Sequence, residues 1–428
     1  MVKYFLLLPT QLFEIKYLSK EYSYILWEHP QYFTKYKFNK KKLLLHRLSM
    51  KSYEEYLKKK GFNVKYYEFK EMPKEKDLRM FETGDKLKIK TEIIDTPYFL
   101  LTKKDCEDYR KKTKKFFFNA FYMWSKNRNN ILPNIKSKDK ENRKIPKNKI
   151  ITTKPTNKYN KKMLNEAISY INTNFKDNYG NTDNFFYPIN HLQAKKWLKN
   201  FVKNKFKDFG PYQDFISKDN PFLNHSLLSS SINIGLLTPK DVIDEVLKYK
   251  NKVPLNSLEG FIRQLYWREY QRYTYLYFDE FNKNYFGNNK KLTTEWYTGE
   301  TGIKPIDDAI KEAFDLAYLH HIKRLMVIGN FMNLSGISPK EGFKWFMEFS
   351  IDSYEWVMYQ NVYEMVFFVS GGGTMRRPYV SSSNYILKMS NYKKDDWTKE
   401  WDKLYNNFLK TKKSKLMKFR YYFRGLNV

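Results

Sequence analysis

A strand, a helix and a second strand follow one another near the N-terminus, and this order limits the possible folds more than any other feature. Residues 3–8 and 24–27 have the apolar content of buried strands. Residues 40–60 have a helical pattern that ends at Gly61, a residue suited to a left-handed helix cap. A further strand is expected at residues 63–67. Because parallel strands are joined by right-handed crossovers, the pattern predicts a parallel, Rossmann-like sheet.

The rest of the chain divides into a connector and a helical half. Short strands are also expected at residues 87–94 and 98–101, so residues 1–125 are predicted to form a small α/β domain. Residues 126–184 are polar and lysine-rich, and prolines interrupt them, so they are predicted to be a connector. Residues 185–428 are predicted to form an all-helical domain. Its expected helices span residues 192–206, 239–250, 258–278, 306–334 and 339–349.

The composition favours a protein that meets a polyanion. The 428 residues carry a formal net charge of +33, and such a surface attracts nucleic acid first and anionic membrane second. Lysine-rich composition can also result from codon drift in a genome rich in A and T. No run of eighteen apolar residues occurs, and the apolar run before Pro9 is too short for a signal peptide core. We therefore expect an intracellular, soluble protein.

The single cysteine limits the covalent and metal chemistry of the chain. Cys106 cannot form an internal disulfide, and it cannot by itself supply a zinc or iron–sulfur site built on several thiolates. The sequence therefore predicts that the protein has no metal centre of this kind. It also predicts that the protein works in a reducing compartment.

Two of the six histidines, His320 and His321, stand side by side in the predicted helix 306–334. Helical spacing places His321 on the face of Leu325 and Ile328, and His320 about a quarter-turn away. One ring can therefore face a pocket while the other packs. A histidine can hold or release a proton near neutral pH, although both rings could equally be ordinary core or surface residues.

Three further segments carry polar groups that a plain helical bundle does not need. Hydroxyls in residues 221–235 cluster at an expected helix start and suit a phosphate, or simply cap the helix. Gln264, Trp267 and Arg268 lie within one helical turn and suit a heterocycle beside a phosphate, unless Arg268 only pairs with Glu269.

The third segment contains Asp352 and Glu355, which could bind ribityl hydroxyls or ring N–H groups, followed by Arg376 and Arg377, which could reach phosphates. A capped helix and a solvated loop are the alternative. Neither a dinucleotide-binding glycine motif nor a P-loop is present in the sequence, so any nucleotide cofactor would be held by helices.

Taken in order, these motifs resemble the photolyase/cryptochrome superfamily, most closely its bacterial-type branch of photolyase-related proteins, which normally carries an iron–sulfur cluster. The resemblance covers most of residues 110–390. It rests on the motifs Phe222-Leu-Asn-His-Ser-Leu-Leu-Ser229, Glu259-Gly-Phe-Ile-Arg-Gln264, Trp267-Arg-Glu-Tyr270, Tyr318-Leu-His-His-Ile-Lys-Arg-Leu-Met326, Ile351-Asp-Ser-Tyr-Glu-Trp356 and Pro378-Tyr-Val-Ser-Ser-Ser-Asn-Tyr-Ile386.

The resemblance implies FAD in the helical domain, a possible antenna chromophore in the N-terminal domain, and light-driven repair of the pyrimidine (6-4) pyrimidone photoproduct in ultraviolet-damaged DNA by a monomer. By position it implies flavin contacts at Ser226, Ser229, Gln264, Arg268, Asp352, Asn384 and Tyr385. It implies proton donation by His321 with His320 beside it, flavin photoreduction by Trp345 and Trp296, and DNA contacts at Trp267, Arg376 and Arg377.

Three departures from the branch change the expectations. The four cluster cysteines are absent, so no iron–sulfur cluster is expected. Residues 7–12 keep Gln11 but lose the glycine and the acid of the family's antenna motif, which puts a lumazine-type antenna in doubt. The segment from Gln264 to Trp267 is also one residue shorter than usual. Repair of cyclobutane dimers, a cryptochrome-like receptor and a basic nucleic-acid protein without cofactor remain alternatives.

Overall fold

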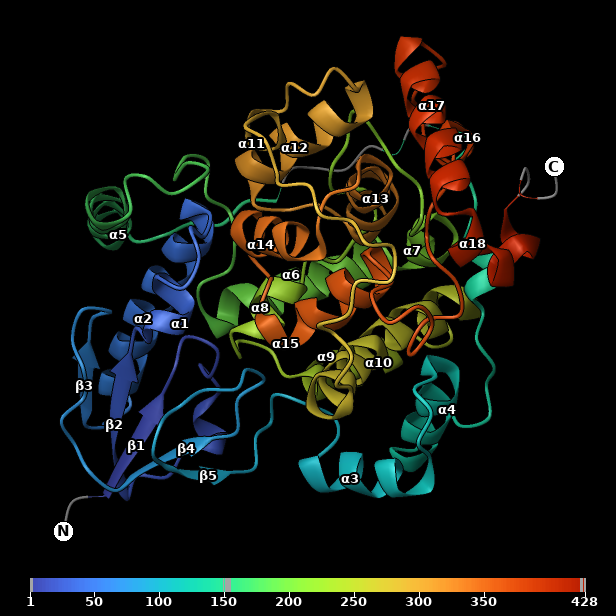
Figure 1. Ribbon diagram of the computed structural model, residues 1–428. Helices are drawn as coiled ribbons and strands as arrows, with labels where there is room; N and C mark the ends of the chain where they lie inside the picture. The colour runs from blue at the N-terminus through green and yellow to red at the C-terminus, as the bar shows by residue number, and fades with distance from the viewer. Residues whose placement is uncertain (1–2, 149, 151–154, 424–425, 427–428) are drawn as a thin grey trace.

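In the computed structural model, the chain is described at residues 3–148, 150, 155–423 and 426. An α/β unit lies at one end and a larger group of helices at the other (Figure 1). Among the helices of these residues, none has the length and apolar character needed to cross a membrane.

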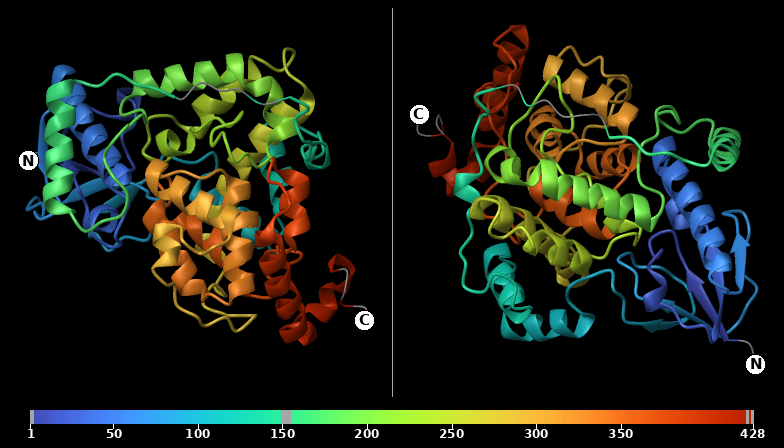
Figure 2. Two further views of the ribbon diagram at one scale, coloured as in Figure 1. Left: turned by 90° about the horizontal axis from the view of Figure 1, so that it is seen from above. Right: turned by 180° about the vertical axis from the view of Figure 1, so that it is seen from behind.

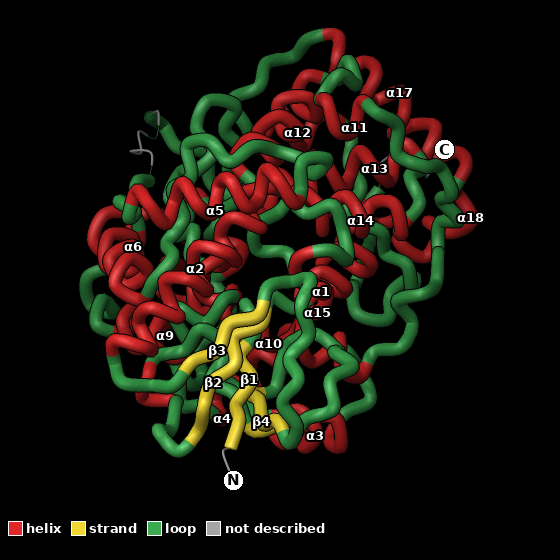
Figure 3. The backbone as a smooth tube through the Cα atoms, turned by 90° about the vertical axis from the view of Figure 1, so that its left-hand side faces the viewer, coloured by secondary structure: helices red, strands yellow, loops and turns green. Residues whose placement is uncertain are grey.

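The predicted parallel sheet is present. Its five strands lie in the order β3-β2-β1-β4-β5, and every neighbouring pair is parallel. Strands β3, β2, β1 and β4 stand side by side in Figure 3. The strands are β1 (Lys3–Leu7), β2 (Tyr22–Trp27), β3 (Val64–Tyr67), β4 (Leu78–Phe81) and β5 (Glu92–Ile94). The central strands carry a continuous apolar run, as both faces of a parallel sheet require; Leu6 and Ile25 are opposite one another in register and fully buried.

The strand predictions fail at three places. Of the strand expected at residues 87–94, only Glu92–Ile94 forms a strand. The sequence pattern did not reveal β4, and the strand expected at residues 98–101 is wrong because this segment is a loop. Its apolar side chains pack against the helical half, and the Leu101 N–H donates at 3.2 Å to Glu269 of the long helix α10 (Leu255–Tyr277). Apolar content alone cannot distinguish a strand from a buried loop of this kind.

The crossover between β2 and β3 is made by α2 (Lys40–Lys59), as predicted. The Asn39 side chain caps the helix by accepting from the Lys41 N–H at 2.9 Å, and Gly61 follows the C-terminus at φ +77°. Two short elements, η1 (Ile15–Tyr17) and α1 (Pro30–Phe33), complete this unit.

Four elements follow the sheet, and they pack in two different places. They are α3 (Lys103–Lys112), α4 (Phe118–Arg128), η2 (Asp139–Glu141) and α5 (Lys161–Asn174). Helix α4 lies beside the long helix α10 of the helical half, where the Phe118 ring stacks on Trp267 with centroids 3.7 Å apart. Helix α5 returns to α2, which Figure 2 shows, and Arg47 of α2 stacks over Tyr170 of α5 at 3.8 Å. The lysine-rich connector therefore contains a helix that covers the α/β unit.

The remaining elements are helical, and α10 runs through their centre. They are α6 (His191–Asn204), α7 (Phe206–Tyr212), α8 (Ser229–Asn233), α9 (Pro239–Leu247), α10 (Leu255–Tyr277), α11 (Glu295–Thr298), α12 (Lys304–Leu316), η3 (Lys323–Gly329), α13 (Asn330–Ser335), α14 (Pro339–Phe349), α15 (Glu355–Met358), η4 (Tyr359–Val366), α16 (Ser383–Met389), α17 (Asp396–Thr411), α18 (Lys413–Leu416) and η5 (Met417–Tyr422).

The single helix predicted over residues 306–334 is wrong. Helix α12 ends at Leu316, Ala317 takes a left-handed conformation at φ 54°, and the chain resumes as the π-helix η3. The carbonyls at the break have partners from distant parts of the chain, because Tyr187 donates to Leu316 at 2.7 Å and the Ile351 N–H donates to Ala317 at 2.9 Å. These partners replace the helical hydrogen bonds, so His320 and His321 lie at the break rather than within a regular helix.

Candidate functional site

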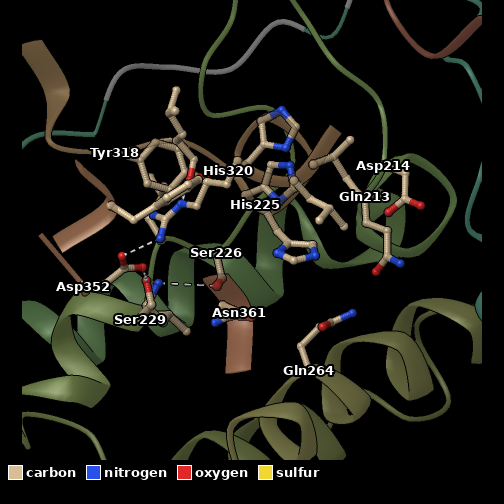
Figure 4. Close-up of a pocket in the computed structure, with 18 of the residues that line it drawn as sticks. Gln213, Asp214, His225, Ser226, Ser229, Gln264, Tyr318, His320, Asp352 and Asn361 are labelled. Atoms are coloured by element: carbon tan, nitrogen blue, oxygen red, sulfur yellow. Dashed lines mark hydrogen bonds and ion pairs between the residues drawn. The ribbon is translucent and has the colours of Figure 1, made fainter. Parts of the chain in front are cut away.

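A cavity of about 290 Å³ opens among α8, α10, η3 and η4. Figure 4 shows its walls, with Gln264 rising from α10 on one side and Ser226 and Ser229 on another. Both π-helical segments, η3 and η4, contribute side chains to it. Segments of π-helix are rare and occur frequently at functional sites.

One wall of the cavity carries a charged network. Asp352 accepts hydrogen bonds from Ser229 at 2.6 Å and Ser350 at 2.5 Å, and it forms an ion pair with Arg324 at 2.9 Å. Burial alone would raise the pKa of Asp352, but the Arg324 guanidinium and the two hydroxyl donors lower it below its ordinary value. The carboxylate is therefore held ionised at the cavity wall.

Two stacked imidazoles form a second wall. The rings of His225 and His320 lie 4.8 Å apart at 15°, and both line the cavity. Among the described residues, the two ring nitrogens of His320 have no hydrogen-bond partner, and the Nε2 of His225 has none either. Burial, followed by nearby positive charges, lowers the pKa of His225 to about 3 and that of His320 well below its usual range. Both rings are neutral, and these buried nitrogens remain without a described partner at the cavity wall.

His321 and Gln264 lie on the open side. Each is exposed at the cavity, in contrast to the buried His320. Protein surrounds the His321 ring on most sides, and this desolvation, with the charges of Arg324 and Arg263, lowers its pKa to about 4. An accessible imidazole and an accessible amide therefore face the same opening.

A basic groove adjoins the cavity. Trp267, Arg376 and Arg377 all line it, together with Arg143, whose guanidinium lies 3.7 Å from Asp214 of the cavity wall. Seven lysines and arginines line the groove against two carboxylates. Arg377 lies over the rings of Tyr379 and Tyr422, at 5.3 and 4.9 Å. Positive charge interleaved with aromatic rings is the surface expected for a nucleic-acid backbone and unstacked bases.

Trp345 lies buried behind the cavity, and its indole Nε1 donates to the Trp296 carbonyl at 2.7 Å. Its ring is 5.3 Å from that of Phe346, which lines the cavity. The two tryptophans are thus adjacent, and one phenylalanine separates Trp345 from the cavity.

Two protein families match parts of this sequence. Residues 5–81 and 70–187 match the family of deoxyribodipyrimidine photo-lyase-related proteins, and residues 261–415 match the FAD binding domain of DNA photolyase. The chain belongs to the photolyase/cryptochrome superfamily. The resemblance inferred from the motifs is confirmed.

Individual relatives agree with this assignment. The photolyase-family chain is 41% identical to a (6-4) photolyase of Agrobacterium fabrum over 236 residues, which cover 54% of this chain and 46% of that relative. The alignment thus spans about half the length of that relative. This chain is also 59% identical over 85 residues to an uncharacterised protein of Acanthamoeba polyphaga mimivirus. That alignment covers 20% of this chain and 69% of that protein. The solved structure of a bacterial class III photolyase from Agrobacterium tumefaciens shares the fold, with a TM-score of 0.63 at 13% identity, covering 91% of this chain and 86% of that one.

The residues of the cavity fit an FAD molecule. The unpartnered nitrogens of His225 and His320 and the exposed Gln264 amide offer polar contacts, and the Ser226 and Ser229 hydroxyls stand at the start of α8. Five predicted site residues thus line one cavity with His321: Ser226, Ser229, Gln264, His320 and Asp352.

Three predicted flavin contacts lie elsewhere. Arg268 is buried between the two halves, where it donates to the Tyr98 carbonyl at 2.6 Å and to Asn233 at 3.1 Å. Asn384 and Tyr385 are on α16, and neither lines the cavity. The alternative expected for Arg268 was a pair with Glu269, and the Glu269 carboxylate lies 3.8 Å from the Arg268 guanidinium, farther than Tyr98 and Asn233.

The position in the sheet where an antenna was expected is filled. In open parallel sheets ligands bind at the carboxyl edge where the strand order reverses, which here is between β1 and β4. Gln11 is fully engaged there, accepting from the Leu8 N–H and donating to the Phe81 carbonyl. Trp356 occupies the adjoining space, since a Cβ on Gly84 would lie 2.3 Å from its ring. The residues of this crevice do not fit an antenna chromophore.

Sequence reasoning missed His225 and Arg324 as site residues. Both belong to motifs that carried the family resemblance. However, His225 and His320 are far apart in the sequence, and no spacing rule connects them. An arginine one helical turn after a histidine pair was the available signal for Arg324.

Proposed function

We propose that this protein is an FAD-dependent DNA photolyase that uses light to reverse pyrimidine (6-4) pyrimidone photoproducts. The proposal rests chiefly on one observation: His321 and Gln264 face the open side of the cavity, and the basic groove with Trp267, Arg376 and Arg377 begins beside it. The similarity to a (6-4) photolyase supports the choice of lesion.

The cavity residues have distinct tasks in this proposal. Ser226 and Ser229 would hold the phosphate portion of FAD, while Asp352, fixed by Arg324, would accept from polar hydrogens of the bound molecule. FAD, when bound and reduced, supplies the photoexcited electron. His225 and His320 close the wall and exclude water.

The groove would position the DNA. Its cations neutralise phosphates without regard to sequence, and Trp267 offers a ring beside the opening. A crosslinked lesion is weakly paired and poorly stacked, so flipping it into the cavity costs less free energy than flipping an intact base.

His321 would deliver the proton that the (6-4) product needs. Its pKa of about 4 in the free protein means that the ring is neutral at pH 7. Phosphates of bound DNA lie on the side where the groove opens, and their negative charge favours the protonated ring. Proton donation is therefore coupled to DNA binding.

The test is an absorption spectrum of the purified protein, followed by irradiation of the flavin-reduced form with oligonucleotides that carry one defined lesion each. We expect a flavin spectrum and loss of the (6-4) lesion only in the light. Repair confined to cyclobutane dimers would contradict the lesion assignment, and a colourless preparation would contradict the cofactor. Photoreduction without repair of either lesion would indicate a cryptochrome-like receptor instead.

A further inference from the structure

Two aromatic routes lead away from Trp345, and each reaches a tyrosine whose hydroxyl donates to a carboxylate. The first route passes from Trp296 to Phe331, Trp401, Trp397 and Tyr392, with centroid separations of 5.7, 5.2, 6.2 and 6.4 Å. The second leads to Tyr297, the residue next to Trp296 on α11. Helices α11, α12 and α14 lie together in Figure 1, and they carry the side chains of the second route.

The second route has two connections. The Trp345 ring is 5.7 Å from Phe314, which is 5.8 Å from Tyr297. The Trp345 indole also donates to the carbonyl of Trp296, whose peptide bond leads directly to Tyr297. Beyond it, the half-buried Tyr179 ring stacks on Tyr297 at 4.5 Å.

Tyr297 has a base in place. Its hydroxyl donates to Glu348 Oε2 at 3.1 Å, and the Glu348 side chain is fully buried. Burial raises the pKa of Glu348 to about 6, in spite of Lys344 and Lys37 nearby, so the group is ionised at pH 7.5 and a stronger base than an ordinary carboxylate. Burial, followed by the Glu348 charge, raises the pKa of Tyr297 itself, so the phenol keeps its proton until it is oxidised.

The other route is longer, because four ring contacts separate Tyr392 from Trp296, whereas two separate Tyr297 from Trp345. The Tyr392 hydroxyl donates to Asp308 at 2.9 Å, but the Asp308 side chain is 32% exposed, whereas that of Glu348 is fully buried.

The tryptophans of this longer route lack a carboxylate partner among the described residues. Trp401 donates to the Ser381 carbonyl at 3.0 Å and Trp397 to the Lys393 carbonyl at 3.1 Å. A backbone carbonyl is a very weak base, so an oxidised indole at either position keeps its positive charge within the protein. Loss of a proton to a carboxylate makes oxidation of a phenol much easier than formation of a charged radical.

We propose that Tyr297 is the terminal electron donor of the path through Trp345, and that Glu348 takes its phenolic proton. This inference rests on the proposed function. Trp345 gives one electron to photoexcited oxidised flavin, and Tyr297 then gives one electron to Trp345. The phenolic O–H bond breaks, its proton goes to Glu348 Oε2, and a neutral tyrosyl radical and a neutral carboxylic acid remain. A thiol in solution then gives a hydrogen atom to the Tyr297 oxygen at its half-buried edge and becomes a thiyl radical, and Glu348 releases its proton to water.

The test is electron paramagnetic resonance on the flavin-loaded full chain, frozen during blue-light irradiation. In wild type, ring-deuterated tyrosine should narrow the light-induced signal, and ring-deuterated tryptophan should leave it unchanged. This labelling needs no substitution, so it does not depend on the folding of any variant.

Matched variants locate the radical. Tyr297→Phe should abolish the tyrosyl signal, and Glu348→Gln, which keeps a hydrogen-bond acceptor but removes the base, should strongly reduce it. Tyr179→Phe, Trp401→Phe and Tyr392→Phe should retain it. An unchanged signal in Tyr297→Phe, or narrowing by tryptophan labelling alone, would overturn the inference while leaving the proposed function standing. A preparation without flavin, or without any light-induced radical, would overturn both.

Discussion

The residues at the cavity differ in what their substitution should do, because some meet the substrate and others hold the wall. His321 is exposed at the opening, whereas Asp352 and Arg324 form an ion pair with less than a sixth of each side chain exposed. Substitution of His321 should therefore affect the chemistry alone. Substitution of Asp352 or Arg324 should affect folding and cofactor retention.

His321→Ala should lower the rate of (6-4) repair by about 100-fold or more, the usual contribution of a general acid. Flavin content and DNA affinity should stay near wild type, because the His321 side chain forms no hydrogen bond to the cavity wall among the residues that the structure describes. Single-turnover repair of a (6-4) oligonucleotide measures the effect. Undiminished repair would show that another group donates the proton.

Asp352→Asn should destabilise the protein by about 3 kcal/mol, because Arg324 is left without its counter-charge in a largely buried site. The folded-state pKa of Asp352 is lowered, so its contribution is complete above the unfolded-state pKa near 4 and is lost as the pH falls through the folded-state pKa. Urea unfolding of the wild type and of Asp352→Asn from pH 7 to pH 3 measures the difference between their free energies of unfolding. This difference should become smaller below about pH 4. A difference in unfolding free energy that grows as the pH falls would contradict this linkage.

At the scale of elements, the break after α12 positions the site. If the helix continued, the histidines would follow its regular geometry and η3 would not form as a separate segment. The left-handed Ala317 and the tertiary partners of its neighbours' carbonyls maintain the break.

Ala317→Gly should therefore stabilise the protein, by up to about 1 kcal/mol, because glycine adopts positive φ without a steric penalty. The control is Ala309→Gly inside α12, which is equally buried but helical, and should destabilise by about 1 kcal/mol. Thermal unfolding of the pair distinguishes the two effects. Destabilisation of similar size at both positions would argue against a left-handed Ala317.

At the scale of the whole molecule, charge and domain packing have separate roles. The net charge of +33 gives general attraction to DNA, while the groove beside the cavity determines where DNA lies. The α/β unit is joined to the helical half through Arg268, Trp356 and Asp85, with the Trp356 N–H donating to Asp85 at 3.0 Å.

Arg376→Ala should weaken binding to damaged and undamaged duplexes alike and reduce the slope of log affinity against log salt by about 1. Lys240→Ala on α9 removes the same charge outside the groove and should leave the slope nearly unchanged. Fluorescence anisotropy across a salt series compares the two. Equal slopes for the two variants would indicate that DNA does not follow the groove.

The sequence alone determined the elements whose signals are local. Apolar runs specified β1 and β2, helical periodicity and Gly61 bounded α2, and ordered motifs identified the superfamily before any geometry was known. These features depend on nearest neighbours along the chain or on residue identity, which a sequence carries directly.

Tertiary structure decided everything that depends on partners distant in sequence. Tyr187 and Ile351 take the carbonyls that would have continued α12, Tyr98 and Asn233 hold Arg268 away from the cavity, and Trp356 fills the crevice beside Gly84. His225 meets His320 only because two loops converge on one cavity. Such contacts form when separate elements compete for the same space and the same hydrogen bonds, and no local pattern records which partner wins.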